Sequence, residues 1–434
     1  MTYEEVNSYF NNLKPFVPVP VKPGELLFDL ETVKKLAGKM DDPQDKIPCV
    51  HITGTNGKGS TAAFLASVLK SAGYKTGTFS SPYLVERREQ IQINSEDIPE
   101  EDFALVAGDV IEKARLLPAD TEASEFEIIT VAAFEYFARE KCDIAVIEVG
   151  MGGEYDATNI IKDPVLAVFT KISSDHTQVL GDSLQEIAKI KSGIIKNKTD
   201  VLMADNDEAV MKIISDKCLA SGGRFSIATL PQIIKSTLSG TEFEYPFEGR
   251  STTLKLNTPG SYQAFNAGVA VSAAEILKAK GYKISEDAVR KGLAEVKRPA
   301  RFEVLMEHPV FIADGSHNPG AVEAFARSLK ELFPDRKFIF ITGVLADKDF
   351  GEMYNPLLGM EKIIYTITPD NPRALPADRL AVVLRQRGAF AEAVGSVENA
   401  VSKALSAAGQ EDIIVAFGSL YYMGDLREIV RTHK

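Results

Sequence analysis

Residues 53–61 read TGTNGKGST, and this stretch decides the class of fold. It follows the apolar segment 50–52 and precedes a segment, 60–72, whose apolar residues recur at helical spacing. A strand, a glycine-rich loop with a lysine, and a helix form the arrangement that binds phosphates. Glycines let backbone N–H groups approach the oxygens, and the helix N-terminus adds positive potential. Lys58 would neutralise the outer phosphates, and Ser60 or Thr61 could reach a magnesium ion.

The loop departs from the standard G-x-x-x-x-G-K-[ST] pattern, because position 52 is Ile and Gly59 separates the lysine from the hydroxyl. The alternative interpretation is a glycine-rich strand-to-helix turn with an exposed lysine. Strand, loop and helix agree with one another, so the sequence favours a phosphate site.

Outward from this stretch, β-rich runs alternate with amphipathic helices, which predicts an α/β fold with mainly parallel sheets. In the first half the predicted strands are 49–53, 76–80, 144–149, 165–170 and 201–204, and the predicted helices are 60–72, 127–139, 184–195, 208–219, 263–279 and 286–295. Residues 243–256 alternate in polarity and predict a small antiparallel excursion. The pattern then restarts, with strands at 310–313, 338–342, 363–367 and 413–417 and helices at 321–332, 376–387 and 397–407.

The cationic, proline-containing segment 297–301 is the predicted boundary, so we expect domains at 1–297 and 298–434 with a cleft between them. The length of 434 residues also predicts two or three domains. A formal charge of −12 without a basic stripe argues against nucleic acid or an anionic membrane as partner. Three sparse cysteines, no signal peptide and no long apolar run predict a cytoplasmic protein, and we expect it to be a monomer.

Several polar residues follow predicted strands at the edge where open α/β sheets bind ligands. Glu148 ends the strand that begins at 144, and its carboxylate would suit a nucleotide-bound Mg²⁺. Asp175 and His176 follow the strand 165–170, and His317 follows the strand 310–313. The alternative is that these residues are solvent-facing or structural.

Two further segments leave their roles open from the residues alone. The helix 184–195 carries Lys189, Lys191 and Lys196, which are usually solvated, and the pattern does not choose among them. Residues 314–320 read DGSHNPG, which predicts either a ligand-binding loop or a helix-capping turn. The second unit has no phosphate loop, so the simplest enzyme binds phosphates on the first unit and completes the site from the second.

Taken together, the motifs resemble the Mur ligase superfamily and, within it, folylpolyglutamate synthase / dihydrofolate synthase. The segments that carry the resemblance run in order over nearly the whole chain: 54–60, 80–84, 124–127, 148–153, 155–159, 175–176 with 180–181, 187–188 with 191–196, 266–267, 301–303, 314–319 and 418–421. The Lys-Gly-Ser order of the loop is the form found in that family.

The resemblance implies a P-loop-containing ATPase domain with a mainly parallel sheet and a smaller Rossmann-like C-terminal domain. ATP would phosphorylate the carboxylate of a folate or of dihydropteroate, and the amine of L-glutamate would displace the phosphate. One or two Mg²⁺ ions would assist, and Lys191 would be carboxylated by CO₂.

The resemblance also assigns site residues by position. Those expected to contact ATP are Gly54, Thr55, Asn56, Gly57, Lys58, Gly59, Ser60, Asn266, Arg301 and Asp314. Those expected to bind the metal are Ser81, Glu148 and His176, with Ser60 close by. Catalysis would rest on Lys58, Glu148, His176 and Lys191, and substrates would contact Ser124, Tyr155, Asp156, Ala157, His317 and Ser419.

One position departs from the family pattern. Glu154 stands where many members that also accept dihydropteroate have Arg, which leaves open whether the enzyme makes dihydrofolate, lengthens polyglutamate tails, or does both. Two rival interpretations are another Mur-type ligase and a P-loop nucleotide switch or kinase. The former usually carries an extra N-terminal domain, for which residues 1–48 are too few, and the latter would need no amino-acid site.

Overall fold

The strand that precedes the phosphate loop lies at the centre of a large sheet. The structure is a computed structural model, and it describes residues 1–13, 29–118, 121–175 and 177–433. In the described residues the first sheet has eight strands in the order β4-β3-β2-β5-β1-β6-β7-β8. Its strands are β1 (Cys49–Thr53), β2 (Thr76–Phe79), β3 (Ile91–Ile93), β4 (Glu96–Asp97), β5 (Ile144–Glu148), β6 (Leu166–Phe169), β7 (Val201–Met203) and β8 (Phe225–Ile227). In this sheet the two antiparallel pairings are those of β3, with β2 and with β4. The other pairings are parallel, so the predicted mainly parallel sheet is confirmed.

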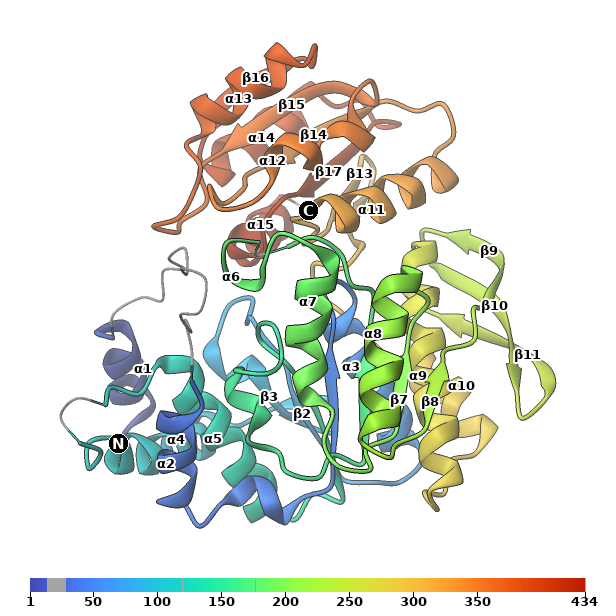
Figure 1. Cartoon of the computed structure of the whole chain (residues 1–434). Helices are drawn as coiled ribbons and strands as arrows, with labels where there is room; N and C mark the ends of the chain where they lie inside the picture. Colours follow the sequence, from blue (N-terminus) through green and yellow to red (C-terminus); the bar gives the residue numbers. More distant parts are fainter. Residues whose placement is uncertain (14–28, 119–120, 176, 434) are drawn as a thin grey trace.

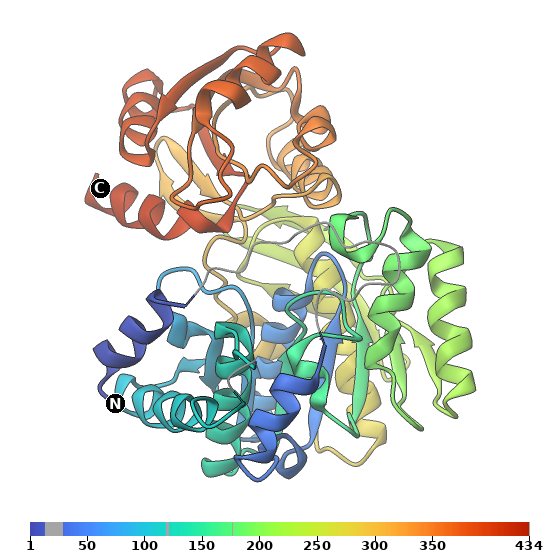
Figure 2. The same ribbon diagram turned by 60° about the vertical axis from the view of Figure 1, so that its left-hand side comes forward.

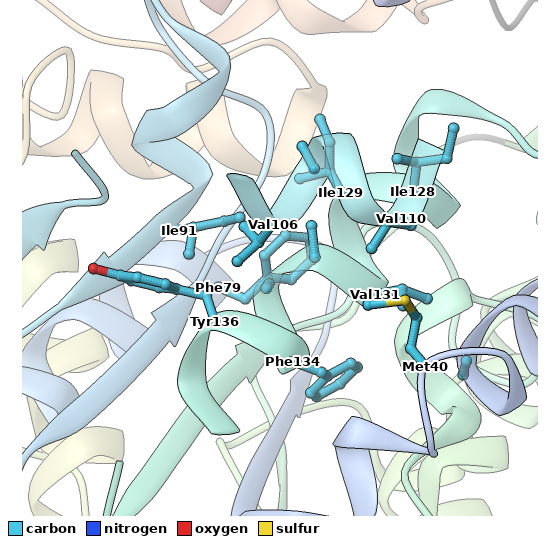
Figure 3. Close-up of a cluster of buried hydrophobic side chains, with 14 of the residues drawn as sticks. Met40, Phe79, Ile91, Val106, Val110, Ile128, Ile129, Val131, Phe134 and Tyr136 are labelled. Atoms are coloured by element: carbon cyan, nitrogen blue, oxygen red, sulfur yellow. The ribbon is translucent and has the colours of Figure 1, made fainter. Parts of the chain in front are cut away.

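Helices cover both faces of this sheet (Figure 1). Their bounds are α1 (Tyr3–Asn11), α2 (Glu31–Gly38), α3 (Lys58–Ser71), α4 (Glu100–Ala114), α5 (Glu125–Arg139), α6 (Thr177–Leu180), α7 (Leu184–Lys191), α8 (Glu208–Ala220), α9 (Ser261–Ala279) and α10 (Glu286–Glu295). Neighbouring residues of β1 point to opposite faces of the sheet. Cys49 belongs to the core that packs against α4 and α5, whereas Val50 belongs to the core that packs against α3 and α9. Figure 3 shows the first of these cores, where Phe79 of β2 and Val106 of α4 meet α5.

A three-stranded antiparallel sheet and a six-stranded sheet complete the described fold. The small sheet contains β9 (Gln232–Thr237), β10 (Gly240–Phe247) and β11 (Arg250–Leu256). The alternating segment 243–256 predicts β10 and β11, whereas β9 lies outside it. The C-terminal sheet has the order β12-β13-β17-β14-β15-β16 and is parallel except for β12. Its strands are β12 (Glu303–Glu307), β13 (Val310–Ala313), β14 (Phe338–Thr342), β15 (Glu361–Ile367), β16 (Ala391–Gly395) and β17 (Ile413–Phe417).

The C-terminal residues, orange and red, form a separate lobe in both views (Figures 1 and 2). Its helices are α11 (Pro319–Leu332), α12 (Phe350–Met353), α13 (Ala377–Gln386), α14 (Val397–Ala407) and α15 (Met423–Thr432). The chain enters this lobe through residues 296–302, between α10 and β12. The predicted boundary at 297/298 lies within this connection.

One predicted helix is too long. The segment 184–195 is α-helical only to Lys191 and continues as a 3-10 turn, Ser192–Ile194. There Gly193 packs against Glu154, because a Cβ at Gly193 would lie 2.4 Å from the Cβ of Glu154. No helix among the described residues has both the length and the apolar character that crossing a bilayer requires.

Candidate active site

The phosphate loop joins β1 to α3 at the carboxyl edge of the first sheet. Gly54 has φ +148°, and a Cβ there would lie 1.9 Å from Oγ1 of Thr170, so only glycine fits. Gly57 has φ +88° and precedes α3, whose N-terminus has no side-chain cap. The first N–H groups of α3 therefore have no side-chain acceptor, which is what a phosphate site needs.

Thr55 and Asn56 fasten this loop to the segment after β6. Their backbone N–H groups donate to the carbonyl of Lys171 at 2.8 and 3.1 Å. Oγ1 of Thr55 donates to the carbonyl of Ser173 at 2.9 Å, and Nδ2 of Asn56 donates to the hydroxyl of Ser173 at 3.1 Å. Because these groups are already bonded, Thr55 and Asn56 shape the loop, and the backbone donors that remain for a phosphate belong to residues 57–60.

Two lysines contact neighbouring carbonyl groups of the loop. Nζ of Lys58 lies 3.4 Å from the carbonyl oxygen of Thr55. Lys191, at the end of α7, is only 3% exposed and donates to the carbonyl of Gly54 at 2.8 Å. Burial, together with the charge of Lys58, lowers the pKa of Lys191 to about 7. Near neutral pH, much of Lys191 is therefore an uncharged amine.

Glu148 ends β5, which pairs in parallel with β1. Its side chain is buried, and Oε2 accepts a hydrogen bond from the backbone N–H of Ser81 at 3.4 Å. Burial raises the pKa of Glu148, although the charges of Lys58, Arg298 and Arg301 oppose this shift. A buried carboxylate thus lies close to three cations, one of which, Lys58, belongs to the phosphate loop.

Gly59 explains why the loop departs from the standard pattern. A Cβ at Gly59 would lie 2.7 Å from a terminal guanidinium nitrogen of Arg298 and 3.0 Å from Oε2 of Glu148. The missing side chain leaves the space in which the carboxylate and the guanidinium approach α3. The hydroxyl of the motif consequently follows one position later, on the buried Ser60.

The predicted metal ligands supply hard oxygen atoms. Glu148 and Ser81 are in contact, Ser60 lies in the first turn of α3, and His176 is outside the described residues. In the described part of the chain, no three His, Cys, Asp or Glu side chains gather as a metal site would require. One carboxylate and hydroxyls beside nucleotide phosphates are the surroundings that Mg²⁺ favours, so these residues fit a nucleotide-bound magnesium ion.

The helix α9 reaches the loop through Asn266. A Cβ at Gly57 would lie 2.3 Å from Oδ1 of Asn266, and Oγ1 of Thr61 donates to the backbone carbonyl of Asn266 at 3.4 Å. Nδ2 of Asn266 donates to Gln263 at 3.1 Å. Asn266 therefore lies directly beside the loop, where its predicted nucleotide contact requires it.

Two arginines of the connection between the lobes face different parts of the site. A terminal nitrogen of Arg301 lies 2.3 Å from the point that a Cβ at Gly315 would occupy, so Arg301 faces the loop after β13. Arg298 faces Gly59 instead. Burial and the charge of Arg301 lower the pKa of Arg298 to about 10. Arg298 is not among the site residues predicted from sequence, because segment 297–301 is interpreted as the domain boundary and only Arg301 in it is expected to contact ATP. The density of cations in this segment is the signal that could have identified Arg298.

In the loop after β13, Asp314 is 1% exposed and accepts hydrogen bonds at both carboxylate oxygens. Oδ2 accepts from the hydroxyl of Tyr262 at 2.6 Å and from the N–H of Phe302 at 2.8 Å. Oδ1 accepts from the N–H of Ser316 at 2.9 Å and from its hydroxyl. Asp314 therefore fastens α9, the connection and the loop to one another.

A cluster of polar side chains joins the two lobes at this edge. The amides of Asn318 and Asn56 exchange hydrogen bonds of 2.9 and 3.1 Å, and Asn318 also donates to Asp175 at 3.0 Å. Lys348 forms a buried ion pair of 2.7 Å with Asp175, and Nε2 of His317 lies 3.9 Å from the same carboxylate. Burial and the charge of Lys348 lower the pKa of His317 to about 4, so this imidazole is neutral at physiological pH. Lys348 is not among the site residues predicted from sequence, since a lysine in a charged loop usually faces water.

Three predicted substrate residues lie in the loop after β5. Asp156 is buried, and its carboxylate accepts from the N–H groups of Met151 at 2.8 Å and of Thr158 at 3.0 Å. Tyr155 is half-buried, and Ala157 is buried in the turn that follows. The side chain of Asp156 therefore organises the loop that presents its neighbours.

The last two predicted substrate residues lie in different places. Ser124 is exposed and caps α5, with its hydroxyl accepting from the N–H of Glu127 at 3.3 Å. Ser419 follows β17, is 3% exposed, and accepts from the N–H of Tyr421 at 3.3 Å. Ser419 thus lies at the same sheet edge as the Asp314 loop, whereas Ser124 lies at a helix start on the first lobe.

A cleft with a volume of about 650 Å³ opens beside these groups. It is lined by Glu148 and Arg298 at the metal side, by Ala63 and Ala66 along α3, and by Leu420 from the C-terminal lobe. The cleft gives a molecule other than the nucleotide access to Glu148.

Comparisons with known proteins agree on both parts of the chain. The model of the Mur ligase middle domain matches residues 52–274, and that of the Mur ligase glutamate ligase domain matches residues 300–420. A dihydrofolate synthase/folylpolyglutamate synthase of Bacillus subtilis is 31% identical over 98% of both chains. The folylpolyglutamate synthase of Mycobacterium tuberculosis, solved with ADP and AMPPCP, has a TM-score of 0.88 and 27% identity over 99% of this chain and 98% of its own. E. coli FolC in complex with DHPP and ADP has a TM-score of 0.83 and 28% identity over 100% and 98% of the two chains.

Proposed function

The chain belongs to the Mur ligase family, and we propose that it uses ATP to join L-glutamate to the carboxylate of a folate through an acyl phosphate. One observation carries this proposal: the buried Glu148, whose carboxylate lies beside Gly59 at the uncapped start of α3, also lines a cleft that the connection and the second lobe complete. A nucleotide switch would not need such a cleft beside its metal ligand. The family resemblance at both lobes supports the same reaction.

The chemistry follows from the positions of the groups. A carboxylate oxygen of the acceptor attacks the γ-phosphorus, and the bond to the β-phosphate oxygen breaks to release ADP. Lys58 and the N–H groups of residues 57–60 hold the phosphate oxygens. A magnesium ion held by Glu148 and Ser81 would neutralise charge on those oxygens. The glutamate nitrogen then attacks the acyl carbon, phosphate leaves, and a proton passes to solvent.

For the glutamate side we propose His317 and Ser419, as the family pattern suggests. His317 is neutral, and its Nδ1 lies 2.8 Å from the carbonyl oxygen of Gly315, so the ring proton is on Nδ1 and Nε2 can accept a hydrogen bond from the ammonium group of glutamate. Glutamate is expected to be preferred over glutamine, because a second carboxylate needs cationic or hydrogen-bonding partners that the amide does not satisfy. For ATP we propose contacts from Asn266 and Arg301, which face the loop and the second lobe.

We further propose that Lys191 is carboxylated. Its amine is buried and has a pKa of about 7, so the uncharged form that reacts with CO₂ is abundant. The carbamate would reverse the charge beside Lys58 and add an oxygen ligand suited to Mg²⁺. Lys191→Ala should lose activity, with partial rescue by acetate. A bare ammonium at this position in a structure with nucleotide and magnesium would contradict the proposal.

The acceptor is tested with a substrate panel. ADP release is measured with tetrahydrofolate or dihydropteroate, each with L-glutamate, with L-glutamine or with neither. Turnover with tetrahydrofolate that requires glutamate is the expected result, and turnover with dihydropteroate would add dihydrofolate synthesis despite Glu154. A rate of ADP release that is the same with and without either acceptor would favour a nucleotide switch. A monomeric state and a cytoplasmic location remain predictions.

A further inference from the structure

Arg298 is a cation of the cleft to which the proposed reaction gives no role. Its guanidinium lies against Gly59, where a Cβ would be 2.7 Å away, and Oε2 of Glu148 would be 3.0 Å from the same point. Nε of Arg298 is buried and has no hydrogen-bond partner among the described residues. Within those residues no carboxylate lies within ion-pairing distance of this guanidinium either. A buried donor without an acceptor is unfavourable unless a ligand supplies one.

The direction in which Arg298 points separates it from the nucleotide contacts. Gly59, Ala63 and Ala66 recur at helical spacing and form one face of α3, and the two alanines line the cleft. The phosphate loop lies at the end of the same helix, so nucleotide phosphates and a molecule in the cleft approach Glu148 from different directions. Both arginines line the cleft, but Arg298 lies against Gly59 and Glu148, whereas Arg301 faces Gly315 and the second lobe.

We propose that Arg298 binds the carboxylate of the acceptor beside Glu148 and holds it for phosphorylation. The assignment rests on the proposed function, since it concerns the acceptor of that same reaction. A guanidinium matches a carboxylate with two parallel N–H donors, and Nε–H is one donor of that fork.

The electrostatics of the step require such a group. An anionic carboxylate must approach the anionic γ-phosphate and pass Glu148, and each of these contacts is repulsive. Arg298 offsets that repulsion while the oxygen–phosphorus bond forms and the bond to ADP breaks. The same N–H groups then remain on the carbonyl side of the acyl phosphate until the glutamate nitrogen displaces phosphate.

The test compares three variants of the full-length enzyme with the parent. Arg298→Ala removes the guanidinium, and Arg298→Lys retains the charge without the fork. Lys291→Ala is the matched control, because Lys291 is an exposed cation of α10 whose ion pair with Glu295 is 3.9 Å long. Initial rates are measured against acceptor at saturating ATP and glutamate, and then against ATP. Acceptor binding without nucleotide is measured by calorimetry.

The expected result is a loss of about 100-fold in kcat/KM for the acceptor in Arg298→Ala, which is the size typical of removing one such donor. Weaker acceptor binding, an ATP KM within about twofold of the parent and partial recovery in Arg298→Lys complete the expectation. Acceptor kinetics equal to those of Lys291→Ala would overturn the proposal, as would an effect confined to the ATP KM. If Arg298→Ala does not fold, Arg298→Lys decides by the same two measurements. A parent without acceptor-dependent turnover would instead refute the proposed function itself.

Discussion

Two strand–loop–helix junctions, one in each lobe, have similar topology and opposite chemistry. The junction of β1 and α3 begins its helix after Gly57 with no side-chain cap. The junction of β13 and α11 begins its helix after Asn318, whose Oδ1 accepts from the N–H of Ala321 at 2.9 Å, with Pro319 in the first turn. The first helix therefore leaves its N-terminal donors for a ligand, whereas the second satisfies its own.

The charged side chains that contact the two loops also differ, in the sign of their charge. Lys191, a cation, donates to the carbonyl of Gly54 in the first loop. Asp314, an anion, accepts from the backbone and the hydroxyl of Ser316 in the second loop. An anion such as phosphate would meet open donors at the first junction and a carboxylate at the second. The comparison explains why a sheet edge alone does not make a phosphate site.

The largest effect is expected for Lys58→Ala, at the uncapped junction. It should lower kcat/KM for ATP by about 1,000-fold, because the lysine neutralises charge that develops on the transferred phosphate. Melting temperature should stay close to that of the parent, since the hydrogen bond that the Lys58 amine makes among the described residues is long, 3.4 Å to the carbonyl of Thr55. Lys212→Ala, an exposed lysine on α8, serves as the control. Near-normal turnover in Lys58→Ala would mean that the loop is only a structural turn.

The next largest effect concerns stability against pH at Lys191. The pKa of Lys191 is about 7 in the folded protein and 10.5 when the lysine is solvated, as in the unfolded chain. Between these two pH values the unfolded chain therefore binds more protons than the folded protein. Stability of the parent relative to Lys191→Met should therefore rise with pH from about 7 to about 10.5, by up to about 1.4 kcal/mol per pH unit. Urea unfolding followed by circular dichroism in CO₂-depleted buffer measures this. A difference that is constant with pH would show that Lys191 is charged in the folded protein.

Arg301→Ala should raise the KM for ATP by about tenfold, the size expected for one hydrogen bond to a charged group. The residue lies between the two junctions, close to Gly315, so its loss would weaken only the contribution of the second lobe to the nucleotide. Arg301→Lys should recover part of the affinity. An ATP KM equal to that of the parent would make Arg301 a solvated residue of the connection.

The smallest effect expected is at the capped junction. Asn318→Ala should lower the free energy of unfolding by about 2 kcal/mol, half from the helix cap and half from the bonds to Asn56 and Asp175. Ser396→Ala removes a similar cap, on α14, whose hydroxyl accepts from Asn399 at 3.2 Å, and should lose only about 1 kcal/mol. Urea unfolding of both variants measures the difference. Equal losses would mean that the contacts between the lobes contribute nothing to stability.

Much of the fold could be predicted because strand cores are continuous apolar runs. The strands β1, β13, β14 and β17 begin and end where the pattern predicts. The strands β3 and β4 escaped prediction, since elements of three and two residues carry little periodic signal. The helix α4 also escaped prediction, although its 15 residues have a buried face. The C-terminal end of α7 escaped because its limit is set by a distant contact, between Gly193 and Glu154.

The candidate site divides in a similar way. Lys58 and Glu148 could be found because each follows a buried strand at the sheet edge. Lys191 could be chosen only by resemblance, since a helical lysine has no local mark, and its burial depends on packing against Gly54. Arg298 and Lys348 lie in charged segments, where only the folded arrangement separates a buried cation from a solvated one.

The paired amides of Asn56 and Asn318 have a thermodynamic consequence. Asn56 shapes the nucleotide loop and also bonds the second lobe, so the geometry of the loop and the contact between the lobes depend on one side chain. Linkage then requires reciprocity: by whatever factor nucleotide strengthens the contact between lobes, closing that contact strengthens nucleotide binding. The two lobes therefore behave as mutual effectors, and an agent that wedges them apart would compete with ATP without occupying its site.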